Sequence, residues 1–169
     1  MRFAVLALVL ALSGTAAPAQ PQGRTIEGAQ RFLSHMLKNR MYRWGMLHSV
    51  AARTGMLVRG HSFITDASAI KKCESQFRID NSRVQISTFT GVRRDFHDLA
   101  PGQKVLADPI DWGSDVSHIR QTERYVHLRF TGGPHESRID MQDAALARRV
   151  SAAIIFLREH CDPTADTEF

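Results

Sequence analysis

One apolar stripe near the end of the chain constrains the fold more than any other feature of the sequence. Its members recur at steps of three or four residues, the spacing of one helix face, and are Leu146, Val150, Ala153, Leu157 and Cys161. Ile154, Ile155 and Phe156 widen the stripe, so we expect a deeply packed helix over residues 140–161. We expect Asp140 to cap its first turn and Pro163 to follow its end.

The start of the chain, residues 1–19, has the pattern of a signal peptide. Arg2 supplies a positive start, residues 3–12 form a short apolar run, and Ala17-Pro18-Ala19 is a small-x-small cleavage site. The run is too short for a membrane span, which needs roughly 20 apolar residues. We therefore expect a periplasmic or secreted protein whose mature chain starts at Gln20.

The chain contains two cysteines, Cys73 and Cys161, on patterns that point them towards the core. In an exported protein the simplest use of two cysteines is one disulfide. Closing a loop of about 88 residues would stabilise the fold by roughly 4–5 kcal/mol through its effect on the unfolded state. Two free thiols or a redox pair are the alternatives, and the lack of a CxxC spacing disfavours the redox pair.

The composition is that of one globular domain, expected over residues 20–169. The sequence is 43% hydrophobic and 23% charged, which is typical of a folded chain rather than a disordered one. A formal net charge of +5 favours weak attraction to anionic surfaces, although it is no signature of nucleic-acid binding. The alternative is a basic surface that is simply solvated.

The pattern before the terminal helix predicts one more helix and several antiparallel strands. Residues 25–39 have helical spacing, with Thr25 as the cap. Period-two alternation predicts one hairpin over residues 73–88 and a second over residues 115–131. The predicted fold class is therefore α+β. It has an N-terminal helix, an antiparallel meander of four to six strands, a long C-terminal helix packed on the sheet, and one disulfide.

The least regular stretch is residues 41–61, which contain methionine, tryptophan and glycine without a clear period. We interpret it as a long loop whose apolar side chains pack against the core. The alternative is an adaptable binding lip, because methionine side chains fit partners of varied shape.

The usual signatures GxSxG, HExxH, GxGxxG and the P-loop are absent from the sequence, and we expect no cofactor. One pair of histidines could hold a metal ion. If residues 122–123 form the turn of the second hairpin, His118 and His127 are directly opposite each other. A third ligand would be needed, and only Asp115 or Glu123 is near in the sequence. The alternative is that both histidines are ordinary half-exposed side chains.

Two short segments, PIDW at residues 109–112 and FLREHCDP at residues 156–163, carry a resemblance to a family. They resemble segments of small, exported, uncharacterised bacterial proteins. The resemblance implies a leading helix, a meandering sheet and a terminal helix that carries the second cysteine. It implies no activity, cofactor or catalytic residue. The expected topology is also similar to that of pleckstrin-homology-like domains, which concerns the fold alone.

The second hairpin gathers Arg120, Tyr125 and Arg129 on one face. A basic face with an aromatic ring can receive an anionic or aromatic ligand, and a plain solvated sheet surface is the alternative. We predict an exported, non-enzymatic binding or accessory module whose partner is a protein or an anionic surface. The alternative function is a small periplasmic enzyme, metal-assisted through His118 and His127.

Overall fold

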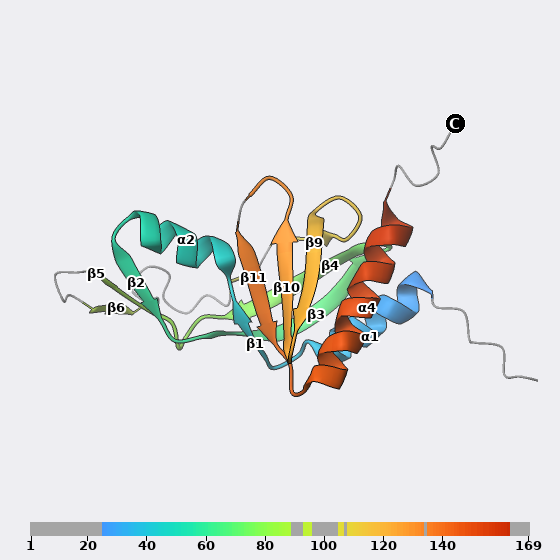
Figure 1. Ribbon diagram of the computed structural model, residues 1–169, viewed down its shortest axis with the longest axis horizontal. Helices are drawn as coiled ribbons and strands as arrows, with labels where there is room; N and C mark the ends of the chain where they lie inside the picture. The colour runs from blue at the N-terminus through green and yellow to red at the C-terminus, as the bar shows by residue number, and fades with distance from the viewer. Residues whose placement is uncertain (1–24, 89–92, 96–104, 107, 134, 163–169) are drawn as a thin grey trace, which may run out of the picture.

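The computed structural model describes residues 25–88, 93–95, 105–106, 108–133 and 135–162 (Figure 1). The predicted α+β fold is confirmed, with an N-terminal helix, an antiparallel sheet and a C-terminal helix tied to the sheet by a disulfide. The expected signal peptide, residues 1–19, lies outside the described residues. The helices of the described chain are α1 (Ile26–Met36), α2 (Gly45–Arg53) and α4 (Ala144–Cys161). None of these described helices has both the length and the apolar character needed to cross a membrane.

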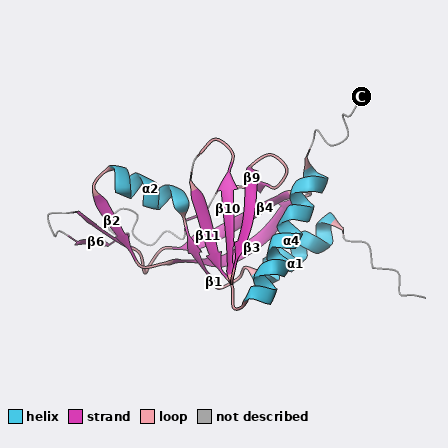
Figure 2. Ribbon diagram, in the orientation of Figure 1, coloured by secondary structure: helices cyan, strands magenta, loops and turns pink. Residues whose placement is uncertain are grey.

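The main sheet is antiparallel throughout and larger than expected (Figure 2). Its strands are β1 (Arg40–Arg43), β3 (Ser62–Lys71), β4 (Glu74–Asp80), β7 (Val105–Leu106), β8 (Ile110–Asp111), β9 (Val116–Thr122), β10 (Tyr125–Phe130) and β11 (Glu136–Asp140). Their order within the described chain is β7-β4-β3-β1-β11-β10-β9, with β8 also paired to β4. The early strand β1 therefore joins the β3–β4 hairpin to the late strands β9, β10 and β11.

A second sheet holds β2 (Met56–Arg59), β5 (Gln85–Thr88) and β6 (Arg93–Asp95), in the order β2-β5-β6. The hairpin expected over residues 73–88 is therefore wrong, because β4 pairs with β3 and β5 pairs with β2. Alternation identifies the buried face of a strand but does not name its partner. A turn at Lys72 and Cys73 joins β3 to β4, and this connection is shorter than the one from β4 to β5.

The interpretation of residues 41–61 as a long loop is also wrong. They hold most of β1, all of α2 and all of β2. Helix α2 packs against both β2 and β11. Its contacts therefore do not form the single apolar stripe, repeating every three or four residues, from which a helix is predicted. Gly45 begins α2 at a point where a Cβ atom would overlap the backbone of Glu136. The first turn of α2 therefore lies directly on β11.

Helix α4 packs against α1, β9 and β10 and completes the core. Val150, Ile154 and Leu157 of the predicted stripe are fully buried, whereas the prediction that Ile155 widens the stripe is wrong, because that residue is 38% exposed. The expected cap is wrong, because the helix begins later and Asp143 caps it by accepting a hydrogen bond from the Leu146 N–H at 2.8 Å. Asp140 instead ends β11, where its backbone is paired on both sides, with β1 and with β10. Backbone pairing with β1 and β10 thus extends β11 through Asp140, the residue that the local sequence predicted as the helix cap.

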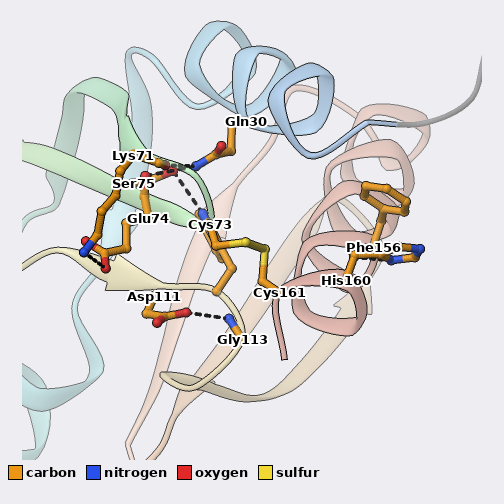
Figure 3. The surroundings of a disulfide bond; sticks show 11 residues. Gln30, Lys71, Cys73, Glu74, Ser75, Asp111, Gly113, Phe156, His160 and Cys161 are labelled. Atoms are coloured by element: carbon orange, nitrogen blue, oxygen red, sulfur yellow. Dashed lines mark hydrogen bonds and ion pairs between the residues drawn. A yellow bond between two sulfur atoms is a disulfide. The ribbon is translucent and has the colours of Figure 1, made fainter. Parts of the chain in front are cut away.

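The predicted disulfide joins Cys73 to Cys161, with Cα atoms 5.6 Å apart (Figure 3). Cys73 lies in the β3–β4 turn with a left-handed φ of 68°. Gln30 of α1 stabilises the same turn, because its side-chain amide donates to the carbonyl oxygens of Lys71 at 3.0 Å and Glu74 at 2.9 Å. The disulfide therefore fastens the end of α4 to a turn that α1 also holds.

Trp112 connects this region to the core. Its indole is fully buried and donates a hydrogen bond to Ser75 Oγ at 2.9 Å. Its backbone N–H donates to the Cys73 carbonyl at 3.0 Å. At the next residue, Gly113, a Cβ atom would overlap the carbonyl group of Cys161. The turn between β8 and β9 is therefore in backbone contact with the end of α4.

Candidate ligand-binding face

The main sheet has an outer face on the side away from α1 and α4. Val126 and Leu128 of β10 and Ile139 of β11 are buried in the core with the residues of these helices. Because side chains alternate along a strand, the residues between them point to the outer face. On β9, β10 and β11 the outer residues are His118, Arg120, Thr122, Tyr125, His127, Arg129, Glu136, Arg138 and Asp140.

Four neighbouring strands place basic side chains directly beside one another on this face. His127 of β10 pairs with Arg120 of β9 on one side and with Arg138 of β11 on the other. Arg138 pairs in turn with Arg43 of β1. Directly opposite residues have Cβ atoms about 4.5–5.5 Å apart. We call Arg120, His127, Arg138 and Arg43 the basic row.

The expected pairing of His118 with His127 is wrong. His118 lies opposite Arg129, and His127 lies opposite Arg120. Each imidazole therefore has an arginine as its direct cross-strand neighbour, which disfavours a shared cation between them. Within the described parts of the chain, no group of three His, Cys, Asp or Glu side chains is placed to hold a metal ion.

The turn of the β9–β10 hairpin explains this register. Thr122 pairs with Tyr125, so the turn consists of residues 123–124, and Glu123 has a left-handed φ of 50°. With a turn at residues 122–123, every pairing would differ by two residues. A two-residue shift leaves each side chain on the same face, so apolar alternation fits both registers. The turn conformation decides between them.

Glu136 neutralises one end of the basic row. Its Oε1 atom accepts a hydrogen bond from Arg120 Nη2 at 3.0 Å and lies 2.7 Å from His127 Nδ1. Burial raises the pKa of Glu136, but the hydrogen bonds and charges of His127 and Arg120 outweigh burial and hold the pKa below its usual value. The carboxylate is therefore an internal counter-ion for the β9 end of the row.

Tyr125 lies beside two guanidinium groups. The distance from its ring centroid to the guanidinium carbon is 4.5 Å for Arg138 and 5.5 Å for Arg124, both within cation–π range. Arg124 forms a two-pronged ion pair with Asp140, with N···O distances of 2.9 and 3.0 Å. Arg138 has no acidic partner among the described residues. The contact with Tyr125 therefore positions the Arg138 guanidinium, whose charge no described carboxylate neutralises.

The three residues predicted as ligand contacts, Arg120, Tyr125 and Arg129, all point to the outer face. Tyr125 and Arg129 lie on β10 on either side of His127, and Arg120 lies opposite His127. Arg120 is occupied by Glu136, whereas the exposed side chain of Arg129 has no ion pair within the described chain. The structure thus gathers the predicted residues on one surface but leaves them unequally available.

The sequence interpretation missed the third strand of this face. It assigned no strand to residues 136–140, although Ser137 and Ile139 are buried between polar neighbours in a period of two. That alternation was the signal for β11. Arg43 was missed because it lies in the stretch that was interpreted as a loop.

The fold and this face together define an α+β domain with a basic, tyrosine-containing sheet surface. The chain matches no protein-family model, no curated protein and no solved structure. The resemblance carried by residues 109–112 and 156–163 stays a prediction.

Proposed function

We propose that the protein is an exported binding or accessory module that recognises an anionic ligand on the outer face of its main sheet. The observation that carries the proposal is the basic row, Arg120, His127, Arg138 and Arg43, on four neighbouring strands. Tyr125 adds an aromatic ring beside the row.

Like charges that lie directly opposite each other in a sheet destabilise it. A bound anion offsets this repulsion and accepts charge-assisted hydrogen bonds from the arginines. Arginine suits this role because its planar fork of donors matches carboxylate and phosphate groups. Side chains on paired strands also keep their relative positions better than side chains on loops. The face therefore presents a preorganised set of donors.

Two observations support the location of the proposed module outside the cytoplasm. Residues 1–19 have the signal-peptide pattern. The Cys73–Cys161 disulfide is compatible with an oxidising compartment. The proposed partner is accordingly an anionic molecule or surface outside the cytoplasm.

The alternative, a metal-assisted enzyme acting through His118 and His127, gains no specific support from the described contacts. His127 is engaged by Glu136 at 2.7 Å, and the exposed His118 lies opposite Arg129. We therefore prefer the binding module.

Titration of the mature protein, residues 20–169, with dextran sulfate tests the proposal, with neutral dextran as the reference. We expect dextran sulfate to bind and its affinity to fall as salt is raised, because the charges on the face are solvent-accessible. The triple variant Arg43→Gln/Arg120→Gln/Arg138→Gln should lose roughly tenfold or more in affinity, since it removes charge-assisted hydrogen bonds.

The matched control is Arg31→Gln/Arg53→Gln/Arg148→Gln, which removes the same charge from exposed positions on the three helices. It should bind dextran sulfate nearly as well as the wild type. Equal weakening in both triple variants would show that only net charge matters and would reject the proposal. Absence of dextran sulfate binding would reject it as well.

A further inference from the structure

The positive charge on the outer face is not evenly neutralised. Glu136 pairs with Arg120 of β9 and His127 of β10, and Asp140 pairs with Arg124 of the β9–β10 turn. By contrast, neither Arg43 nor Arg138 has an acidic partner among the described residues. The free positive charge of the basic row is therefore concentrated where β1 meets β11.

Backbone pairing holds Arg43 and Arg138 together at this point. They are directly opposite each other in the β1–β11 ladder. The guanidinium carbon of Arg138 also lies 4.5 Å from the Tyr125 ring centroid, which restricts its movement. Two like charges held opposite each other are unfavourable, and an anion bound between them would remove the repulsion.

Helix α2 brings a third basic group to the same place. The Gly45 N–H donates to Ser137 Oγ at 3.2 Å, and the Tyr42 hydroxyl donates to the same oxygen at 3.1 Å. These contacts fix the first turn of α2 against β11. His48 lies in that turn, and its half-buried side chain is within electrostatic reach of Arg43, His61 and Arg138.

The pKa of the His48 imidazole depends on the positive charges around it. Burial lowers the pKa of His48, and the positive charges of Arg43, His61 and Arg138 lower it further. These three side chains come from β1, from the connection between β2 and β3, and from β11, and they are the charged groups that act on His48. An anion bound among them would favour the charged imidazole and raise its pKa.

We propose that Arg43, Arg138 and His48 form a binding site for a phosphate group, with the exposed His61 at its edge. The inference rests on the proposed anion-binding function and names its ligand class. A phosphate group carries up to two negative charges and several acceptor oxygens, enough for two guanidinium forks and an imidazole. A single carboxylate carries one charge and would leave part of the site unpaired.

The probe for this site is inorganic phosphate, compared with chloride at equal ionic strength and followed by NMR of the His48 ring in the mature protein. Saturating phosphate should raise the pKa of His48 by about one unit, because the bound anion offsets the surrounding positive charges. The Arg43→Gln/Arg138→Gln variant should weaken phosphate binding at least about tenfold. Arg138→Lys, which keeps the charge and loses the fork, should retain part of the shift.

The matched control is Arg31→Gln/Arg148→Gln, which removes the same charge from exposed positions on α1 and α4. It should leave the phosphate affinity and the His48 response unchanged. The inference is overturned if phosphate does not move the His48 pKa in the wild type. It is equally overturned if Arg31→Gln/Arg148→Gln weakens phosphate binding as much as Arg43→Gln/Arg138→Gln.

A second arm separates a soluble phosphate from a lipid headgroup. Vesicles of phosphatidylcholine with and without phosphatidic acid are added in place of inorganic phosphate. A His48 shift with phosphatidic acid vesicles supports the site and assigns a membrane source, whereas a shift with inorganic phosphate alone supports it and assigns a soluble source. If dextran sulfate binds but no phosphate species moves His48, this inference fails and the proposed function stands. If dextran sulfate does not bind, the proposed function fails.

Discussion

Single side chains decide how much of the basic row is free to bind a ligand. The carboxylate of Glu136 already occupies one end of the row, because it lies between Arg120 and His127. Only 27% of its side chain is exposed, so this ion pair is partly shielded from solvent. No equivalent carboxylate among the described residues reaches Arg138. One acidic residue therefore separates an occupied end of the row from an open end.

The first prediction concerns the pH dependence that Glu136 adds. The pKa of Glu136 is lower in the folded protein than in the unfolded chain, where glutamate titrates near about 4.3. Its stabilisation is therefore present above that pH and is lost as pH falls through the folded pKa. Between about pH 6 and pH 3, the free energy of unfolding of the wild type, measured with urea, should decrease. This decrease should exceed the decrease measured for Glu136→Gln by roughly 0.5–1 kcal/mol.

Glu159→Gln, at an exposed position of α4, is the control and should keep the wild-type pH profile. Parallel profiles for the wild type and Glu136→Gln would contradict the ion pair at the β9 end of the row.

Contacts between elements, rather than within them, fix the positions of α2 and α4. Each contact depends on a glycine at which a Cβ atom would meet backbone. Gly45 lets α2 touch β11, and Gly113 lets the β8–β9 turn touch the end of α4. Both contacts join segments that are distant in sequence. The candidate phosphate site depends on the first of them, because it positions His48.

The second prediction tests the contact at Gly113. Gly113→Ala should lower the free energy of unfolding by about 1–3 kcal/mol, because the new methyl group overlaps the Cys161 carbonyl and neither backbone can move easily. Gly133→Ala is the matched control, since the nearest atom to its new Cβ is 3.7 Å away. Equal urea midpoints for the two variants would mean that the turn and the end of α4 are not in contact.

The third prediction concerns the disulfide between the β3–β4 turn and α4. Replacing both Cys73 and Cys161 with serine should lower the free energy of unfolding by about 2–5 kcal/mol, because the unfolded chain gains the freedom of a long loop. Amide hydrogen exchange should accelerate in the last turn of α4 while the centre of the helix stays protected. A loss of less than about 1 kcal/mol would assign the stability of this region to packing alone.

At the level of the whole molecule, an early strand lies in the middle of the main sheet. β1 separates β3 from β11, so the sheet cannot be completed until distant parts of the chain have met. Helices α1 and α4, near the two ends of the described chain, pack against each other on the inner face (Figure 1). Both helices therefore lie on the opposite face from the outer side chains of β1, β9, β10 and β11.

The fourth prediction concerns the exported form of the protein. The positive start, apolar run and Ala17-Pro18-Ala19 site predict cleavage after Ala19. N-terminal sequencing of the exported protein should therefore return Gln20 as the first residue. Recovery of Met1 from the exported fraction would contradict the signal peptide, whereas Ala19→Arg should block cleavage and leave the precursor at its full length.

Local patterns were enough to identify the helices that frame the core and the face of each late strand. The Thr25 cap is confirmed by its hydrogen bond from the Gly28 N–H, and Val150, Ile154 and Leu157 of the α4 stripe are fully buried, as their spacing predicts. The disulfide is confirmed as well. These features depend on spacing within one segment or on the chemistry of a residue type, and both can be read without knowing which segments meet.

Strand partners and register were decided only by the tertiary structure. A period of two is compatible with any antiparallel neighbour and with any even shift, so it predicted the outer face of β10 but not that Arg120 would lie opposite His127. The same limit hid the pairing of Arg43 with Arg138, because β1 and β11 are far apart in sequence. The sequence by itself therefore determined which side chains point away from the core. The pairing of distant strands decided which of these side chains lie next to each other. Hydrogen bonds between strands join backbone groups and form in the same way for any side chain.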